Sequence, residues 1–141
     1  MSQYSLEEQL EILKKNFNSY SVTLSSFLAE IAPRSSFRLY KPVIEQLVNE
    51  NSNKIIDTFV LTALKYEDKI MQEDDNFFMG KNYDNELEFD NEKIGKVFEF
   101  KSIWESLSDP NKSVIKSYMK LLCRIARKYY NLIYDNRNVK K

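Results

Sequence analysis

Large apolar residues recur along the start of the chain at alternating steps of four and three, the pattern of one side of an α-helix. Ser5, followed by Glu8, matches the capping box that opens many helices, and Pro33 marks a stop. We therefore expect a long first helix of about 26 residues, roughly 39 Å in length. Its apolar seam consists of Leu6, Leu10, Leu13, Phe17, Tyr20, Leu24, Phe27 and Ile31.

This seam fits two arrangements. A heptad-like repeat is typical of a coiled-coil dimer, but it also suits a helix that forms the long side of a bundle within one chain. The residues beside the seam are more often Asn, Ser and Thr than paired Glu and Lys, so we favour the one-chain bundle. Self-association through the seam is the alternative.

Two further helices are predicted in the middle of the chain. After a link at residues 34–39, residues 41–49 form the second helix, with Pro42 in its first turn. Residues 54–72 repeat apolar side chains at helical spacing, and Asn53 is placed to cap this third helix.

Residues 73–91 show the least regular pattern. They combine acidic and Asn-rich patches with Gly80 and with four large side chains, Phe77, Phe78, Met79 and Tyr83. A structureless loop of this length is unusual inside a compact domain. We expect its aromatic residues to tuck onto the core, and the alternative is an exposed anchor for a partner.

The C-terminal part predicts a helical hairpin. Residues 91–107 place Trp104 on an apolar side, and Asp109 and Pro110 then mark the start of the last helix. Residues 136–141 are polar, so we expect a frayed tail. The apolar side of the last helix consists of Ile115, Tyr118, Leu122, Ile125, Tyr129 and Leu132.

These elements predict one all-α domain over residues 1–141, a bundle of four to five helices with a long first helix and a C-terminal helical hairpin. The composition agrees, because hydrophobic residues make up 43% of the chain and there are only two Gly and three Pro. No apolar run approaches the 18 or so residues of a membrane span, and the start of the chain lacks a signal-peptide pattern.

Charge divides the chain although its net charge is zero. Residues 67–92 hold ten acids and two lysines, and residues 111–141 hold nine bases and one acid. The basic side of the last helix either binds a phosphate backbone or an acidic partner, or is covered by the acidic segment of the same chain. We slightly favour the covered arrangement. The candidate residues for this basic face are Lys112, Lys116, Lys120, Arg124, Arg127 and Lys128.

The chain offers little for catalysis. It has no histidine, which excludes Ser-His and Cys-His pairs and His metal sites. Cys123 is the single cysteine, and two glycines do not make the usual phosphate-cradling loop. A calcium loop aligned on Gly80 would place Phe77 and Met79 where oxygen ligands are needed. We therefore expect no catalytic residues, no cofactor, no metal and no small-molecule substrate.

Residues from Ile103 to Leu122, about 30 residues with their flanks, carry one resemblance. A Trp at 104, a Leu-Ser turn at 107–108 and an Asn-Lys pair at 111–112 open a helix that contains Tyr118. This arrangement resembles uncharacterised small helical proteins of nucleocytoplasmic large DNA viruses. The resemblance implies a virus-encoded helical protein in the host cytoplasm or in the virus particle.

Together these features predict a non-enzymatic interaction or structural protein that works through a protein partner or self-association, in the cytoplasm and without a membrane. The alternative function is sequence-nonspecific nucleic-acid binding through the basic face of the last helix.

Overall fold

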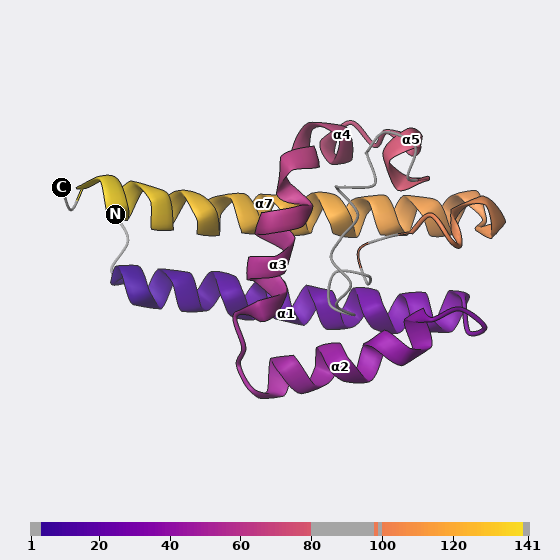
Figure 1. Cartoon of the computed structure of the whole chain (residues 1–141), viewed down its shortest axis with the longest axis horizontal. Coiled ribbons are helices and arrows are strands. Elements are labelled where there is room, and N and C mark those ends of the chain that lie inside the picture. The colour runs from indigo at the N-terminus through magenta and orange to yellow at the C-terminus, as the bar shows by residue number, and fades with distance from the viewer. Residues whose placement is uncertain (1–3, 80–97, 99, 140–141) are drawn as a thin grey trace.

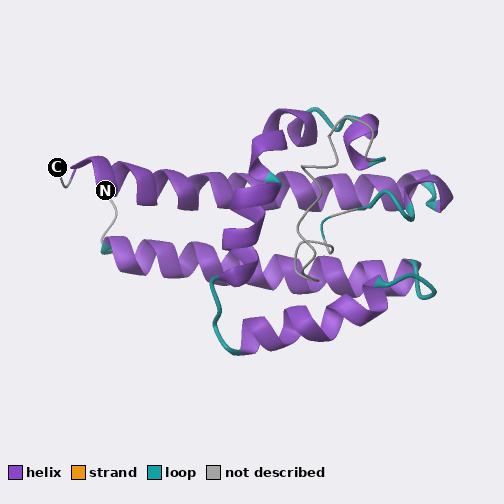
Figure 2. Cartoon of the chain, viewed as in Figure 1, coloured by secondary structure: helices purple, strands orange, loops and turns teal. Residues whose placement is uncertain are grey.

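Two long antiparallel helices, α1 and α7, lie side by side and organise the molecule (Figure 1). The computed structural model describes residues 4–79, 98 and 100–139. Over these residues the chain forms six α-helices, two 3-10 helices and no strand (Figure 2), so the predicted all-α class is confirmed. The elements in chain order are α1 (Leu6–Ile31), α2 (Phe37–Asn49), α3 (Lys54–Thr62), η1 (Leu64–Tyr66), α4 (Glu67–Met71), α5 (Asp75–Phe78), η3 (Trp104–Ser106) and α7 (Asp109–Val139).

The remaining helices are arranged around this pair. α2 turns back along α1, and α3 then crosses both long helices, bringing α4 and α5 next to α7 (Figure 1). Because α1 and α7 run in opposite directions, the start of α1 and the end of α7 lie at the same end of the molecule. Within the described part of the chain, no helix is both long and apolar enough to cross a membrane.

Helix α1 has the predicted bounds. The Ser5 hydroxyl accepts a hydrogen bond from the Glu8 N–H at 3.1 Å, and the Glu8 carboxylate accepts one from the Ser5 N–H at 3.2 Å. This reciprocal pair is the predicted capping box, which satisfies two N–H groups at the start of the helix. Phe17 and Leu24 of the seam are fully buried, whereas Leu10, Leu13, Phe27 and Ile31 are partly buried and pack against the core.

Helix α2 begins earlier than predicted. It starts at Phe37, so the expected link at residues 34–39 is wrong, and Pro42 lies inside the helix. Proline cannot donate a backbone hydrogen bond, so the carbonyl one turn earlier loses its helical partner. The tertiary contact of Phe37 outweighs this loss, because its ring is buried and stacks against Phe100 with centroids 6.4 Å apart.

The predicted third helix is divided into α3, η1 and α4. Helix α3 ends at Thr62, and the chain then bends through η1, where Leu64 and Tyr66 are buried, before α4 follows alongside α7. The expected cap is also different. The hydroxyl of Ser52, in place of the Asn53 side chain, accepts from the N–H of Lys54 at 3.0 Å.

The aromatic residues at the start of the irregular segment tuck onto the core, as we expected. Phe77 and Phe78 form the second half of α5 and are buried, while the Asp74 carboxylate accepts from the Asn76 N–H at 2.9 Å and caps this short helix. The remaining features predicted there, Gly80 and Tyr83 among them, lie outside the described residues.

The predicted fourth helix is wrong in its described part. Residues 100–107 form turns and the 3-10 helix η3, so the expected C-terminal hairpin has a short turn where its first helix was predicted. Residues 91–97 lie outside the described part of the chain. Ser108 caps α7, because its hydroxyl accepts from the Asn111 N–H at 3.3 Å, and Asp109 is already helical.

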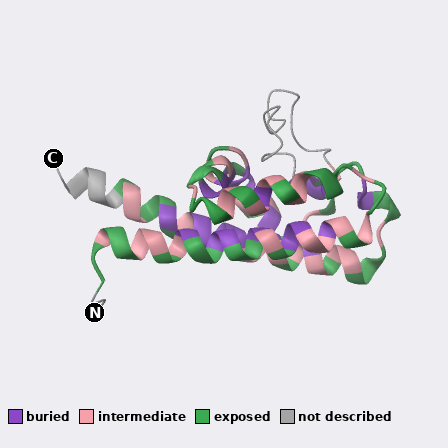
Figure 3. Cartoon of the chain, turned by 90° about the horizontal axis from the view of Figure 1, so that it is seen from below, coloured by how far each residue is buried: buried purple, intermediate pink, exposed green. Residues whose placement is uncertain are grey.

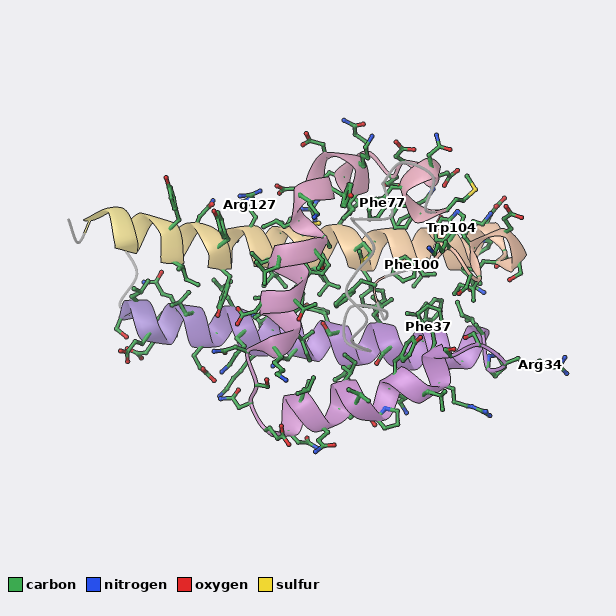
Figure 4. All side chains as sticks on the ribbon, viewed as in Figure 1. Arg34, Phe37, Phe77, Phe100, Trp104 and Arg127 are labelled. Carbon is green, nitrogen blue, oxygen red and sulfur yellow. The ribbon has the colours of Figure 1, made fainter. Side chains whose placement is uncertain are left out.

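A continuous cluster of aromatic rings fills the space between the long helices. Figure 4 shows Phe100 between Phe37 and Trp104, and these contacts connect α2 to η3. Phe17 and Phe59 extend the cluster towards α1 and α3, with their ring centroids 5.2 Å apart. The core therefore depends on edge-to-face and stacked contacts between aromatic rings from α1, α2, α3, η1, α5 and η3 and from the loop that carries Phe98 and Phe100.

Candidate interaction surface

Five of the six candidate cations of α7 recur every four residues and wind around the helix; they are Lys112, Lys116, Lys120, Arg124 and Lys128. A step of four residues turns by about 400°, so each successive cation is displaced by about 40° from the one before. Over the four steps from Lys112 to Lys128 the displacement reaches roughly 160°. The first cations therefore point towards α4 and α5, and Lys128 points to the opposite side of α7, where it faces α1.

Three of these cations are held by acids of the same chain. Lys116 Nζ lies 2.7 Å from Asp75 Oδ1, and Lys120 Nζ lies 2.9 Å from Glu73 Oε2. Arg127 donates to Glu67 Oε1 from Nη2 at 2.8 Å and from Nε at 3.0 Å. The described part of the acidic segment thus covers one side of α7, as the charge distribution suggested. We call these three ion pairs the acidic clasp.

The acidic clasp is only partly shielded from water. The hydrogen bond from Lys120 lowers the pKa of Glu73 below its usual value, and the positive charge of Lys120 adds to this effect. Each exposed ion pair contributes little to the stability of the fold, so the clasp acts mainly by fixing where α4 and α5 lie.

The ammonium groups of Lys112 and Lys116 also lie 5.7 and 5.8 Å from the centre of the Trp104 ring, within cation–π range.

Arg124 and Lys128 are exposed and form no ion pair with any described residue. Two exposed tyrosines follow them on α7. Tyr130 and Tyr134 are 40% and 52% exposed, and their rings lie parallel, 3° apart in plane, with centroids separated by 6.2 Å. The Arg127 guanidinium lies 5.6 Å from the Tyr130 ring centre, so the end of α7 presents cations and aromatic faces together.

An apolar groove of about 490 Å³ lies between the start of α1 and the last turns of α7. Ile12, 41% exposed, and Leu13 form its α1 wall, and Leu132 with Lys128 form its α7 wall. Tyr4, Gln9 and Asn131 complete the lining. Figure 3 shows that buried residues concentrate in the middle of the bundle and give way to half-buried and exposed ones at this end. We call this hollow the α1–α7 groove.

The α1–α7 groove was not predicted from the sequence. Ile12 lies outside the apolar seam, and the two walls of the groove are more than a hundred residues apart in the chain. One signal was present: Ile12 is a large apolar residue on the side of the first helix that a simple bundle would expose.

A second hollow, of about 220 Å³, lies between α3 and α7. Its rim includes Leu61, which is 76% exposed, and Tyr130. Partial burial raises the pKa of the Tyr129 hydroxyl, and the neighbouring Asp57 carboxylate raises it further. This hydroxyl therefore stays protonated at neutral pH and acts as a hydrogen-bond donor.

Cys123, the single cysteine, lies on the buried side of α7. Burial raises the pKa of its thiol to about 12, and the negative charge of Glu67 adds to this effect. Only the thiolate is a strong nucleophile, so this side chain is a packing residue.

A comparison with known proteins found one giant-virus relative. The chain is 25% identical over 139 residues to an uncharacterised protein of Acanthamoeba polyphaga mimivirus, an alignment that covers 92% of this chain and 77% of the viral protein. No family model matches the sequence, and no solved structure matches the fold. The similarity weakly supports the link to uncharacterised giant-virus proteins that residues 103–122 suggested.

Proposed function

We propose that this chain is a non-enzymatic interaction protein that docks a protein partner in the α1–α7 groove. The observation that carries the proposal is the groove itself, an apolar hollow at the open end of the bundle with the exposed side chain of Ile12 on its wall and the cation Lys128 at its edge. Helix α1 also packs against α2 and α3, and Glu11 already bonds to Asn51 in the turn between them, whereas Ile12 and Leu13 face the groove beside α7.

The chemistry of the groove suits a protein interface. Interfaces combine an apolar centre with Tyr and Arg anchors and a polar rim, and here Leu13 and Leu132 are bordered by Gln9 and Asn131. The cation at the edge favours a partner with an acidic group next to its apolar contact.

The relative in mimivirus supports a virus-encoded protein, and we propose that it acts in the host cytoplasm or in the virus particle. The inert thiol of Cys123 and the absence of histidine support a role without catalysis.

A photo-crosslinking amino acid at Ile12 tests the proposed groove. The matched control carries the same group at Leu39, an exposed apolar residue of α2 away from the groove. We expect a discrete protein adduct from position 12 in cells that make the chain, and none from position 39. No adduct at position 12, or the same adducts from both positions, would refute docking in the groove.

Nucleic-acid binding is the second candidate function, and the end of α7 favours it. Arg124 and Lys128 are free to contact phosphates, and the exposed rings of Tyr130 and Tyr134 can stack on bases. The acidic clasp already occupies three of the six predicted cations, which leaves a small footprint.

Binding of labelled single-stranded RNA and DNA at about 50 and 200 mM salt tests this candidate. With two or three phosphate contacts, the logarithm of the affinity should fall with a slope of about −2 against the logarithm of salt concentration. Arg124→Glu with Lys128→Glu should abolish binding, whereas Lys54→Glu, on α3, should leave it unchanged. Equal loss in both variants would show that binding reflects overall charge only.

A further inference from the structure

The apolar seam of α1 divides into a buried row and a half-exposed row. Phe17 and Leu24 are fully buried, but Leu13 and Phe27 are half-buried and Tyr20 between them is 39% exposed. Residues seven apart on a helix drift by only about 20° around its axis, so Leu13, Tyr20 and Phe27 follow one line. The fold of one chain leaves this line incompletely covered.

The half-exposed row runs into the α1–α7 groove. Leu13 belongs to both, and Leu132 of α7 faces it from the other wall. The two long helices therefore present a shared apolar surface that begins at the open end of the bundle and continues along α1. Two side-by-side helices cannot cover such a surface themselves, whereas a second helix pair laid on it completes a four-helix bundle.

We propose that the occupant of this surface is a second copy of this chain, so that two α1–α7 pairs form an intermolecular four-helix bundle. This inference deepens the proposed function and rests on it, because it names the partner that the groove receives. In a two-fold dimer each surface contacts its own copy, so apolar rows meet apolar rows on both sides of the axis.

The charges around the surface fit a self-complementary contact. Glu8 lies one turn before Ile12 on α1, and Arg124 and Lys128 lie on α7; all three are exposed and form no ion pair with any described residue. A surface of one sign would repel its copy, but here each copy offers an acid and two bases, so contacts of opposite charge can form twice. The zero net charge of the chain removes long-range repulsion between copies.

Sedimentation velocity of the untagged, full-length chain over a range of concentrations tests this inference. We expect a concentration-dependent monomer–dimer equilibrium for the wild type. Tyr20→Glu and Ile12→Glu should each raise the dimer dissociation constant by at least about tenfold, because each would bury a charge in an apolar interface. Leu39→Glu places the same charge on an exposed apolar residue of α2 and should leave the constant unchanged. Circular dichroism confirms that each variant folds.

The electrostatic part of the inference has its own test. Lys128→Glu should weaken the dimer severalfold and should reduce the dependence of dimerisation on salt, while Lys54→Glu should not. A chain that stays monomeric at every concentration would overturn the inference. So would a dimer that tolerates Tyr20→Glu, Ile12→Glu and Lys128→Glu, because its interface would lie elsewhere.

The crosslinking experiment distinguishes self-association of the chain from docking of another protein in the groove. A monomeric chain that still forms a discrete adduct from position 12 with another protein would overturn self-association and leave groove docking intact. A monomeric chain with no adduct from position 12 would refute both.

Discussion

The indole ring of Trp104 stacks on the ring of Phe78, with centroids 4.8 Å apart and planes inclined by 14°. This contact joins η3 to α5, elements separated by 25 residues of chain between Phe78 and Trp104. Trp104 is only 1% exposed, and the ammonium groups of Lys112 and Lys116 lie near its ring. Trp104 therefore connects the segment before α7 to α5, which carries one acid of the acidic clasp, and to α7 itself.

Trp104→Ala should destabilise the fold by roughly 3–5 kcal/mol, because it removes a large buried side chain and leaves a cavity. Trp104→Phe keeps an aromatic ring and should cost clearly less. Chemical denaturation of both variants measures the free energy of unfolding. A loss below about 1 kcal/mol for the alanine variant would contradict the burial of this ring.

The acidic clasp predicts a pH dependence in the acid range. The pKa of Glu73 is lowered in the folded protein, chiefly by its hydrogen bond with Lys120, so its contribution to stability is present above the ordinary value of 4.5. That contribution is lost as pH falls through the folded-state pKa. An NMR titration of the Glu73 carboxyl group should show the low pKa, and Lys120→Met should return it towards 4.5. An unchanged pKa in the variant would show that Lys120 is not the cause.

Cys123 should be inert to thiol reagents in the folded protein. Its raised pKa means that the folded state favours the protonated thiol, so its contribution to stability is full below the ordinary value of 9.0 and is lost as pH rises towards about 12. At pH 8 the native thiol should react only at the rate of unfolding, and added denaturant should make the reaction fast. Rapid modification of the native protein would place the thiol at the surface.

The turn between α2 and α3 offers a test of backbone strain. Asn51 has a positive φ of 55°, its carbonyl accepts a hydrogen bond from Lys14 Nζ at 3.0 Å, and its side chain donates to Glu11 at 2.8 Å. Asn51→Ala should cost about 1–2 kcal/mol more than Asn51→Gly, because only glycine adopts this conformation without strain. Both variants lose the side-chain bond to Glu11, so the difference in their unfolding free energies isolates the backbone term.

Short-range sequence patterns predicted the helices whose bounds depend on interactions between residues close together in the chain. The seam and the capping box of Ser5 determine α1, and both act within a few residues. The start of α2 and the break after Thr62 depend on tertiary contacts. Phe37 is buried against Phe100, far along the chain, and no Gly or Pro marks the end of α3. Spacing alone does not contain this information.

The same distinction applies to the surfaces. The spacing of Lys116 and Lys120 predicted a basic side of the last helix, and the charge count suggested the acids that cover it. The α1–α7 groove escaped prediction because its walls meet only when the two ends of the chain come together. Tyr130 and Tyr134 lie outside the predicted apolar side of the last helix, and both are exposed in the structure.

Helix α1 begins and helix α7 ends at the same end of the molecule, which is also the end that bears the α1–α7 groove. An affinity tag or fluorescent protein fused to either terminus therefore lies next to the groove and competes sterically with the partner that would bind there. A tagged sample can report a monomer that the fusion itself has produced. Fusions inserted at the turn between α1 and α2, at the opposite end of the bundle (Figure 1), are the better choice for imaging this protein.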